Sequence, residues 1–288
     1  MMPKYKNLLI RTVVGAAYVA LMVAGVFVFP LMDVLLCVAA CIAIFECMRL
    51  VSGPVDRLSM VLLMVATVVQ FAVILNFGLR RSSFFYNAEM MTLFMFVVVA
   101  VLTIISLSVA LSVLELLRHR PAPLEHMGVP LFAYSWIVIP LGFLAVMTRV
   151  CPPLILAFLI LIWTYDTFAY LGGTLYGRNK MCEHISPKKT WEGTVTGFIM
   201  TVVMAIVLPS IPYFGHLHIA LWKWVVFAIL IVLFGTVGDL LESLLKRRAG
   251  VKDSGSIMPG HGGMLDRFDS ILIASIPALL FALTVMIP

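Results

Sequence analysis

Long apolar runs separated by short polar stretches fill most of this chain. Each run is close to the roughly 20 residues that an α-helix needs to cross the ~30 Å hydrocarbon core of a bilayer. The pattern predicts an all-α, polytopic membrane protein of about nine transmembrane helices. Their approximate ranges are 8–29, 31–50, 58–77, 90–117, 129–147, 152–171, 194–209, 219–245 and 268–287.

The basic residues predict the orientation of these helices. If the N-terminus lies in the cytoplasm, the opposite side receives only four of the 20 Lys and Arg residues, namely Arg80, Arg81, Arg149 and Lys223. Membrane proteins show such an excess of Lys and Arg in their cytoplasmic loops. We therefore expect a cytoplasmic N-terminus, and we expect loops 172–193 and 246–267 to form the active site at the cytoplasmic face.

Composition supports this class and narrows the partners. Hydrophobic residues make up 62% of the chain and charged residues only 12%, whereas a soluble domain has about 25% charged residues. The net charge of +6 is explained by topology and by anionic lipid headgroups, so we expect no nucleic-acid partner. We predict an N-terminal transmembrane scaffold of about five helices in 1–150, where Glu46 and Glu115 are interpreted as interfacial. The polar residues concentrate in 151–288, which predicts a catalytic region of about four helices and two cytoplasmic loops.

The sixth and eighth predicted spans contain carboxylates, namely Asp166 in the sixth and Asp239 and Glu242 in the eighth. Ionisable residues at membrane depth are costly and mark candidate functional sites. Asp239 and Glu242 share one helix face at i and i+3, as do Asp266 and Asp269. Carboxylate oxygens suit a hard cation such as Mg²⁺, and the sequence lacks the Cys/His cluster typical of zinc sites. The alternative is that Asp239 pairs with Arg247 or Arg248 and only organises the helix bundle.

Both charged loops contain residues suited to phosphate. Lys188 and Lys189 are adjacent cations, and Thr190 is a predicted helix cap beside them. Basic residues next to free amides at a helix start form an anion site, although the preference for positive charge in cytoplasmic loops explains these lysines equally well. His261, flanked by glycines, is open to two readings, proton transfer or one structural hydrogen bond.

The segment 243–269 carries a specific resemblance. Its Ser, Lys-Arg, Lys-Asp, Pro, His-Gly-Gly, Asp-Arg and Asp positions reproduce the spacing of the signature of the phosphatidate cytidylyltransferase family. These positions are Ser243, Lys246, Arg247, Lys252, Asp253, Pro259, His261, Gly262, Gly263, Asp266, Arg267 and Asp269. The second loop also resembles that family, in Asp166, Gly172 and the run 185–193.

The resemblance implies an enzyme that converts CTP and phosphatidic acid to CDP-diacylglycerol and pyrophosphate, in phospholipid biosynthesis. It implies Mg²⁺ bound by Asp239 and Asp266, with Asp166 as a further ligand and a second cation left open. The implied catalytic residues are Asp239, Asp266, Lys252, Arg267 and His261. The implied nucleotide-binding residues are Ser186, Lys188, Lys189 and Thr190, and the implied lipid-phosphate ligands are Lys246 and Arg247.

Two other functions fit part of the pattern. A CTP-dependent lipid kinase would transfer the γ-phosphate and release CDP. An ion-coupled transporter would use the buried carboxylates for cations, but it predicts inverted repeats and broken helices near the midplane, and no repeat is apparent. The expected location is a bacterial inner membrane, with the bilayer as a partner and a homodimer as one expected assembly.

Overall fold

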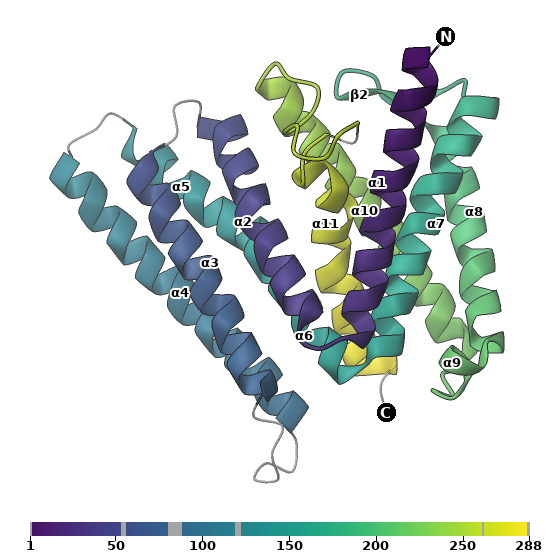
Figure 1. The fold of residues 1–288 in the computed structure, drawn as a ribbon, viewed down its shortest axis with the longest axis horizontal. Coiled ribbons are helices and arrows are strands. Elements are labelled where there is room, and N and C mark those ends of the chain that lie inside the picture. Colours follow the sequence, from purple (N-terminus) through teal and green to yellow (C-terminus); the bar gives the residue numbers. More distant parts are fainter. Residues whose placement is uncertain (1, 53–55, 80–87, 119–121, 261, 287–288) are drawn as a thin grey trace. The chain divides into compact units, whose positions relative to one another are not determined.

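The structure is a computed structural model that describes residues 2–52, 56–79, 88–118, 122–260 and 262–286. Helices dominate it, which confirms the all-α, polytopic class (Figure 1). Eight helices among the described residues are long and apolar enough to cross a membrane, and the shorter apolar helix Thr12–Phe27 falls in the first predicted span. The cytoplasmic position of the N-terminus stays a prediction.

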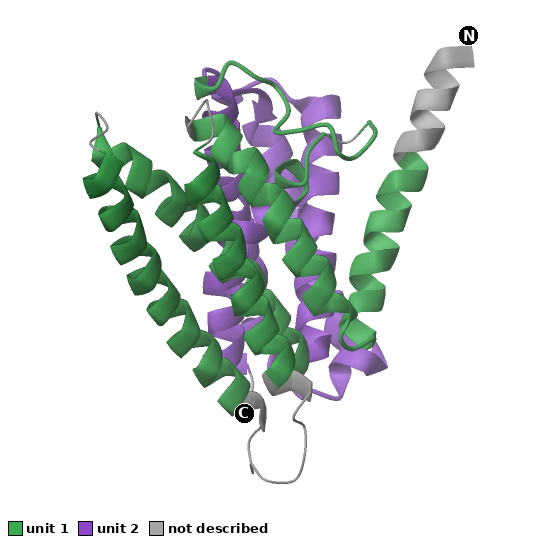
Figure 2. Ribbon diagram, turned by 60° about the vertical axis from the view of Figure 1, so that its left-hand side comes forward, with its two compact units in different colours: residues 1–150, 248–267 green, residues 151–247, 268–288 purple. Residues whose placement is uncertain are grey.

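The chain forms two compact units, which Figure 2 colours separately. The first comprises residues 1–150 and 248–267, and the second comprises residues 151–247 and 268–288. The sequence-based division also has a boundary after residue 150, but it assigns 248–267 to the C-terminal region. The scaffold and catalytic roles of the two regions stay predictions.

The first unit is a helical bundle around one buried segment. Its helices are α1 (Met2–Phe27), α2 (Leu31–Ser52), α3 (Arg57–Leu79), α4 (Ala88–Arg118), α5 (Pro123–Ala133) and α6 (Ile139–Val150). The π-helix Tyr134–Val138 joins α5 to α6, so Pro123–Val150 is one membrane-length segment. This segment is mostly buried and contacts α2, α3 and α4. It therefore forms the core of the first unit.

The second unit is built around a close helix pair. Its helices are α7 (Pro152–Tyr176), α8 (Trp191–Val207), α9 (Pro212–Gly215), α10 (Leu221–Arg248) and α11 (Leu265–Phe281), although Arg248 and 265–267 belong to the first unit. Prolines at the first positions of α7 suit a helix start, where no N–H partner is needed. A Cβ at Gly197 of α8 would lie 2.9 Å from Tyr165 Cδ2 of α7. Glycine therefore allows these two backbones to approach.

A β-hairpin is the departure from the predicted fold. Strands β1 (Lys180–Cys182) and β2 (Ser186–Thr190) pair antiparallel between α7 and α8. The sequence predicted only a loop there. Lys180 pairs with Thr190 and Cys182 pairs with Ser186. The hairpin thus gives the predicted nucleotide-binding residues a defined backbone.

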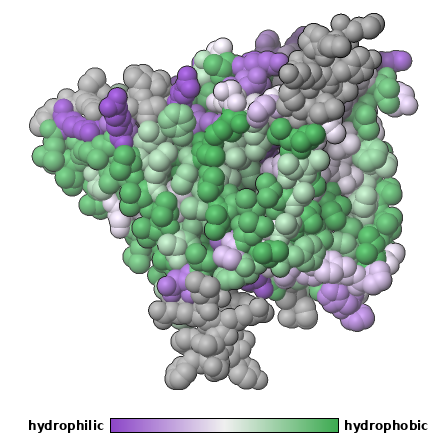
Figure 3. All heavy atoms as spheres, in the orientation of Figure 1, coloured by the Kyte–Doolittle hydropathy of each residue, from purple (hydrophilic) through white to green (hydrophobic). Residues whose placement is uncertain are grey.

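Apolar side chains cover much of the helix surface. On the face drawn in Figure 3, hydrophobic residues lie along the middle of the helices and hydrophilic residues gather toward their ends. On α4, Leu102, Ile105 and Val109 are each more than half exposed. Such a surface would be unfavourable in water and is expected where helices face lipid.

Candidate functional site

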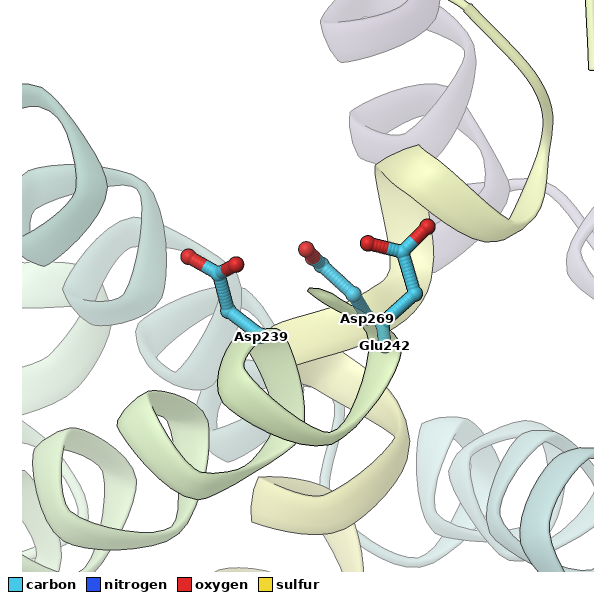
Figure 4. A group of neighbouring side chains, drawn as sticks. All are labelled: Asp239, Glu242 and Asp269. Atoms are coloured by element: carbon cyan, nitrogen blue, oxygen red, sulfur yellow. The ribbon is translucent and has the colours of Figure 1, made fainter. Parts of the chain in front are cut away.

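A cluster of three carboxylates lies in the second unit. Asp239 and Glu242 come from α10 and Asp269 comes from α11, and Figure 4 shows their carboxyl groups side by side. One oxygen from each residue lies within 4.8 Å of the other two. Gly238 makes this possible, because a Cβ there would overlap the Asp269 carbonyl oxygen and lie 3.2 Å from Ser270 Cα. The missing side chain lets α10 and α11 approach where the carboxylates meet.

Two lysines partly compensate the charge of this cluster. Lys189 Nζ, from the hairpin, lies 2.5 Å from Asp239 Oδ2, and Lys246 forms an ion pair with Glu242, which is fully buried. Ser243 Oγ donates a weak hydrogen bond to Asp239 Oδ1 at 3.4 Å. The ion-pair partner of Asp239 is thus Lys189. The alternative prediction had Asp239 paired with Arg247 or Arg248 instead.

Asp166 on α7, the further predicted metal ligand, is exposed. Asp269 Oδ1 itself accepts a hydrogen bond from Ser270 N at 2.7 Å. Three clustered carboxylates against two lysines leave excess negative charge when all are ionised. This oxygen-only donor set has the chemistry that a hard divalent cation such as Mg²⁺ requires.

The hairpin presents the predicted nucleotide-binding residues. Lys188 is exposed whereas Lys189 reaches Asp239, as expected for neighbouring strand residues that point to opposite faces. Thr190 is the predicted cap of α8, and its hydroxyl accepts a hydrogen bond from Gly193 N at 3.2 Å. This cap is confirmed. Ser186 opens β2 and is half-buried.

The end of α10 is tied to the hairpin. Arg247 Nε donates a hydrogen bond to the Ile185 carbonyl oxygen at 3.2 Å. Glu192, at the start of α8, accepts hydrogen bonds from the backbone N–H groups of Arg178 and Asn179, each at 3.1 Å. A surface pocket lined by 175–179 and Glu192 lies beside these bonds. Both predicted lipid-phosphate ligands therefore have contacts within the protein: Lys246 pairs with Glu242, and Arg247 binds the Ile185 carbonyl oxygen.

The other predicted residues belong to the first unit. Asp266 Oδ2 accepts hydrogen bonds from Ser254 N at 2.9 Å, Ser254 Oγ at 3.0 Å and Gly263 N at 2.7 Å. Lys252 is exposed, and the buried Nε of Arg267 has no hydrogen-bond partner within the described part of the chain. His261 lies outside the described residues. The predicted sharing of one metal by Asp239 and Asp266 stays a prediction.

Three acidic residues have larger structural roles than the sequence suggested. Glu242 and Asp269 each share a helix face with a predicted ligand, yet neither was assigned as a ligand. Glu46 accepts hydrogen bonds from residues that follow it by 208 to 219 positions. The helical spacing of Glu242 from Asp239, and of Asp269 from Asp266, could have identified the first two residues. No local sequence pattern could reveal the partners of Glu46, because they lie far along the chain.

Comparisons with known proteins identify the family. The model of the cytidylyltransferase family matches residues 9–286, which is nearly the whole chain. A phosphatidate cytidylyltransferase of Staphylococcus saprophyticus is 47% identical over 119 residues, or 41% of this chain and 44% of that protein. The enzymes of the same name from Staphylococcus epidermidis and Staphylococcus aureus are each 45% identical, over 119 and 116 residues.

The chain thus spans less than half the length of the curated relatives that it matches. The match to the family model is far longer: it covers residues 9–286, which include both the carboxylate cluster and the signature segment. The chain therefore belongs to the cytidylyltransferase family.

Proposed function

We propose that this protein is a phosphatidate cytidylyltransferase, which converts CTP and phosphatidic acid to CDP-diacylglycerol and pyrophosphate. The family match over residues 9–286, with relatives of that name at 45–47% identity, carries the proposal. The acidic cluster and its lysines are the chemical groups that such a reaction needs.

The bonds that form and break in this reaction require no covalent intermediate with the protein. An oxygen of the lipid phosphate attacks the α-phosphorus of CTP, and a new P–O bond forms. The bond from that phosphorus to the α–β bridging oxygen breaks, and pyrophosphate leaves with this oxygen. A phosphate monoester has a second pKa of about 6, so the nucleophile is largely ionised at neutral pH. A general base is unnecessary, and His261 is proposed only as a further residue of the signature.

The protein must therefore position two anionic substrates and offset their charge. We propose that Lys188, Lys189, Thr190 and Ser186 bind the triphosphate from the hairpin. Lys246 and Arg247, at the end of α10, are proposed to receive the lipid phosphate. Lys252 and Arg267 are proposed to neutralise the triphosphate and the leaving pyrophosphate.

The carboxylates are proposed to bind Mg²⁺. The resemblance points to Asp239, Asp266 and Asp166, and the cluster adds Glu242 and Asp269 as candidates. When bound, the cation would offset charge on the phosphate oxygens, the chemistry that phosphoryl-type transfer usually draws from a metal. Asp239 and Lys189 then act as a pair, because the carboxylate orients a lysine that the triphosphate also attracts.

We further propose that the protein acts in a bacterial cytoplasmic membrane, since the matched relatives are bacterial and the helices are of membrane length. Soluble CTP would then arrive from the cytoplasm while the acyl chains of the lipid stay in the bilayer. The positive charge predicted for the cytoplasmic face suits both anionic substrates.

The test is to follow two labels. Detergent-purified protein is incubated with Mg²⁺, phosphatidic acid and CTP labelled either in the cytidine or at the γ-phosphate. The proposal predicts cytidine label in the lipid and γ-label in pyrophosphate. γ-Label in the lipid would instead identify a lipid kinase, and cation flux into liposomes without nucleotide would identify a transporter.

A further inference from the structure

Glu46 on α2 is a buried carboxylate that binds the start of α11. It is 4% exposed. Its Oε1 accepts a hydrogen bond from Met264 N at 3.0 Å, and its Oε2 accepts one from Leu265 N at 2.8 Å. The first N–H groups of a helix have no partner within the helix, and a negative charge near them is favourable. All of these residues belong to the first unit.

Two glycines of the same segment make room for this carboxylate. A Cβ at Gly255 would overlap Glu46 Oε1, and a Cβ at Gly263 would lie 2.5 Å from both Glu46 oxygens. Real Cβ atoms do not approach other atoms so closely. The backbone of the segment is therefore shaped to accommodate a glutamate at position 46. Glu46 thus has a structural role beyond that of a residue at the membrane interface.

Ser254 connects Glu46 to the signature carboxylate. Its hydroxyl lies 2.9 Å from Glu46 Oε2 and 3.0 Å from Asp266 Oδ2, while its backbone N–H also donates to Asp266. Because a hydroxyl carries one proton, it donates to one carboxylate at a time. Ser254 is 7% exposed, so water does not readily replace these bonds. One buried serine thus fixes the distance between the two acidic groups.

We propose that Glu46 is a positioning residue that holds 254–265 and, through Ser254, orients Asp266 for the reaction. The inference rests on the proposed function for the role of Asp266 as a Mg²⁺ ligand. A residue needed only for packing would not have to be a carboxylate, because burying one is costly unless hydrogen bonds compensate it. Here two backbone N–H groups compensate it, and the Ser254 hydroxyl is a third donor when its proton points to Glu46.

The test compares Glu46→Gln with a matched control, Glu115→Gln. Glu115 is 5% exposed in the same unit, and within the described residues its Oε2 accepts no hydrogen bond. The amide nitrogen of Gln cannot accept, so Glu46→Gln must release at least one donor. We expect faster hydrogen exchange in peptides covering 254–266 and a Mg²⁺ requirement raised roughly 10-fold, the scale of outer-shell changes at metal sites. Glu115→Gln should change neither.

A second variant separates positioning from folding. Ser254→Ala removes the hydroxyl that bridges Glu46 and Asp266, but it leaves the backbone N–H bond of residue 254 to Asp266 and the bonds of Glu46 to Met264 and Leu265. It should raise the Mg²⁺ requirement as Glu46→Gln does, with the amides of Met264 and Leu265 still protected. The effects of the two variants should not add in the double mutant, because both act on one network.

Electron paramagnetic resonance of bound Mn²⁺ compares the metal affinity of the wild type with that of the two variants, and it does not require turnover. Weaker binding in both variants supports the inference. An active wild-type protein whose variants keep its Mg²⁺ requirement and Mn²⁺ affinity would overturn it. A wild-type protein that makes no CDP-lipid would instead refute the proposed function, and unchanged Mn²⁺ affinity in the variants would still overturn the positioning role.

Discussion

At the scale of single residues, Asp239 and Lys189 connect two groups that the sequence assigned to different tasks. Asp239 was predicted to bind a metal and Lys189 to bind phosphate, and the structure joins them at 2.5 Å. An ion pair that is partly open to solvent is worth little by itself, but this pair lies beside two further carboxylates. Under the proposed function, its value would lie in the placement of charge for anionic substrates.

Replacement of Asp239 by asparagine tests this placement. Asp239→Asn keeps the shape of the side chain but removes a carboxylate charge from the cluster. We expect CDP-lipid formation to fall by at least on the order of 100-fold, the scale of losing a key electrostatic group. Steady-state assays of protein that elutes as a single species would show the loss. Glu125→Gln, on the exposed face of α5, should retain full activity. Turnover near that of the wild type in Asp239→Asn would contradict the role.

Asp56 gives the first unit a pH-dependent contact. Partial burial alone would raise the pKa of Asp56, but hydrogen bonds from Ser59 and Arg118 outweigh it and lower that pKa. Both Asp56 oxygens lie 2.9 Å from Arg118 Nη1. A lowered folded-state pKa stabilises the fold above the unfolded value of about 3.9. This stability is lost as the pH falls through the folded-state pKa.

Thermal unfolding of the wild type and of Asp56→Asn in detergent checks this sign. At neutral pH the wild type should be more stable by up to about 1 kcal/mol, as expected for a partly exposed ion pair. The difference should shrink as the pH falls below about 4, where the unfolded carboxyl group is protonated. A difference that stays the same from neutral to acid pH would rule out this contact as its source.

At the scale of elements, glycines set how closely the helices of the second unit approach. Gly197 of α8 faces Tyr165 of α7, and Gly172 of α7 faces Thr196 of α8. Tyr165 also lies 2.6 Å from Thr236 of α10, through its hydroxyl. A change at the α7–α8 contact would therefore affect the helix that carries Asp239.

We predict that Gly197→Ala destabilises the second unit. The added methyl group must displace Tyr165 or the α7 backbone, and overpacking of this kind typically costs about 1–3 kcal/mol. Gly128→Ala is the matched control, because a Cβ there meets nothing within 4 Å. The control should be neutral or slightly stabilising, since alanine is the better helix former. Thermal unfolding compares the two, and an equal midpoint for both variants would refute the close approach.

The elements show what sequence reasoning can reach. Long apolar runs predicted every membrane-length helix, because lipid requires both length and hydrophobicity, although the helix Pro123–Val150 starts six residues before its predicted range. The Thr190 cap was also predictable, since a cap acts on residues beside it. The hairpin was missed because β1 and β2 are short and contain lysine and proline in place of alternating apolar residues. The Glu46 contacts escaped detection because their partners lie far along the chain.

At the scale of the whole molecule, the signature segment supplies residues to both units. Asp266 and Arg267 belong to the first, and Lys246 and Asp269 belong to the second. The sequence motif groups these residues into one predicted site by their spacing along the chain. Spacing alone does not indicate to which unit each residue belongs. The match to the family model includes all four residues. Their common role in one site stays a prediction.

The predicted orientation places the hairpin in the cytoplasm and the α9–α10 connection on the opposite side. Glu183 in the hairpin turn and His216 after α9 are both exposed. With the five native cysteines replaced, Glu183→Cys and His216→Cys provide one reporter on each side. A membrane-impermeant maleimide applied to intact cells, with the outer barrier opened where one exists, should label only His216→Cys. Labelling of Glu183→Cys alone would show that the orientation in the membrane is the opposite of the predicted one.

The most direct test of the central claim is a ³¹P nuclear magnetic resonance time course of purified protein with CTP, phosphatidic acid and Mg²⁺. The proposal predicts that the three CTP resonances disappear while pyrophosphate and a lipid-linked diphosphate diester appear in equal amounts. Asp239→Asn should leave the CTP resonances unchanged over the same time. Accumulation of CDP with a lipid diphosphate monoester, or intact CTP with the wild-type protein, would contradict cytidylyl transfer.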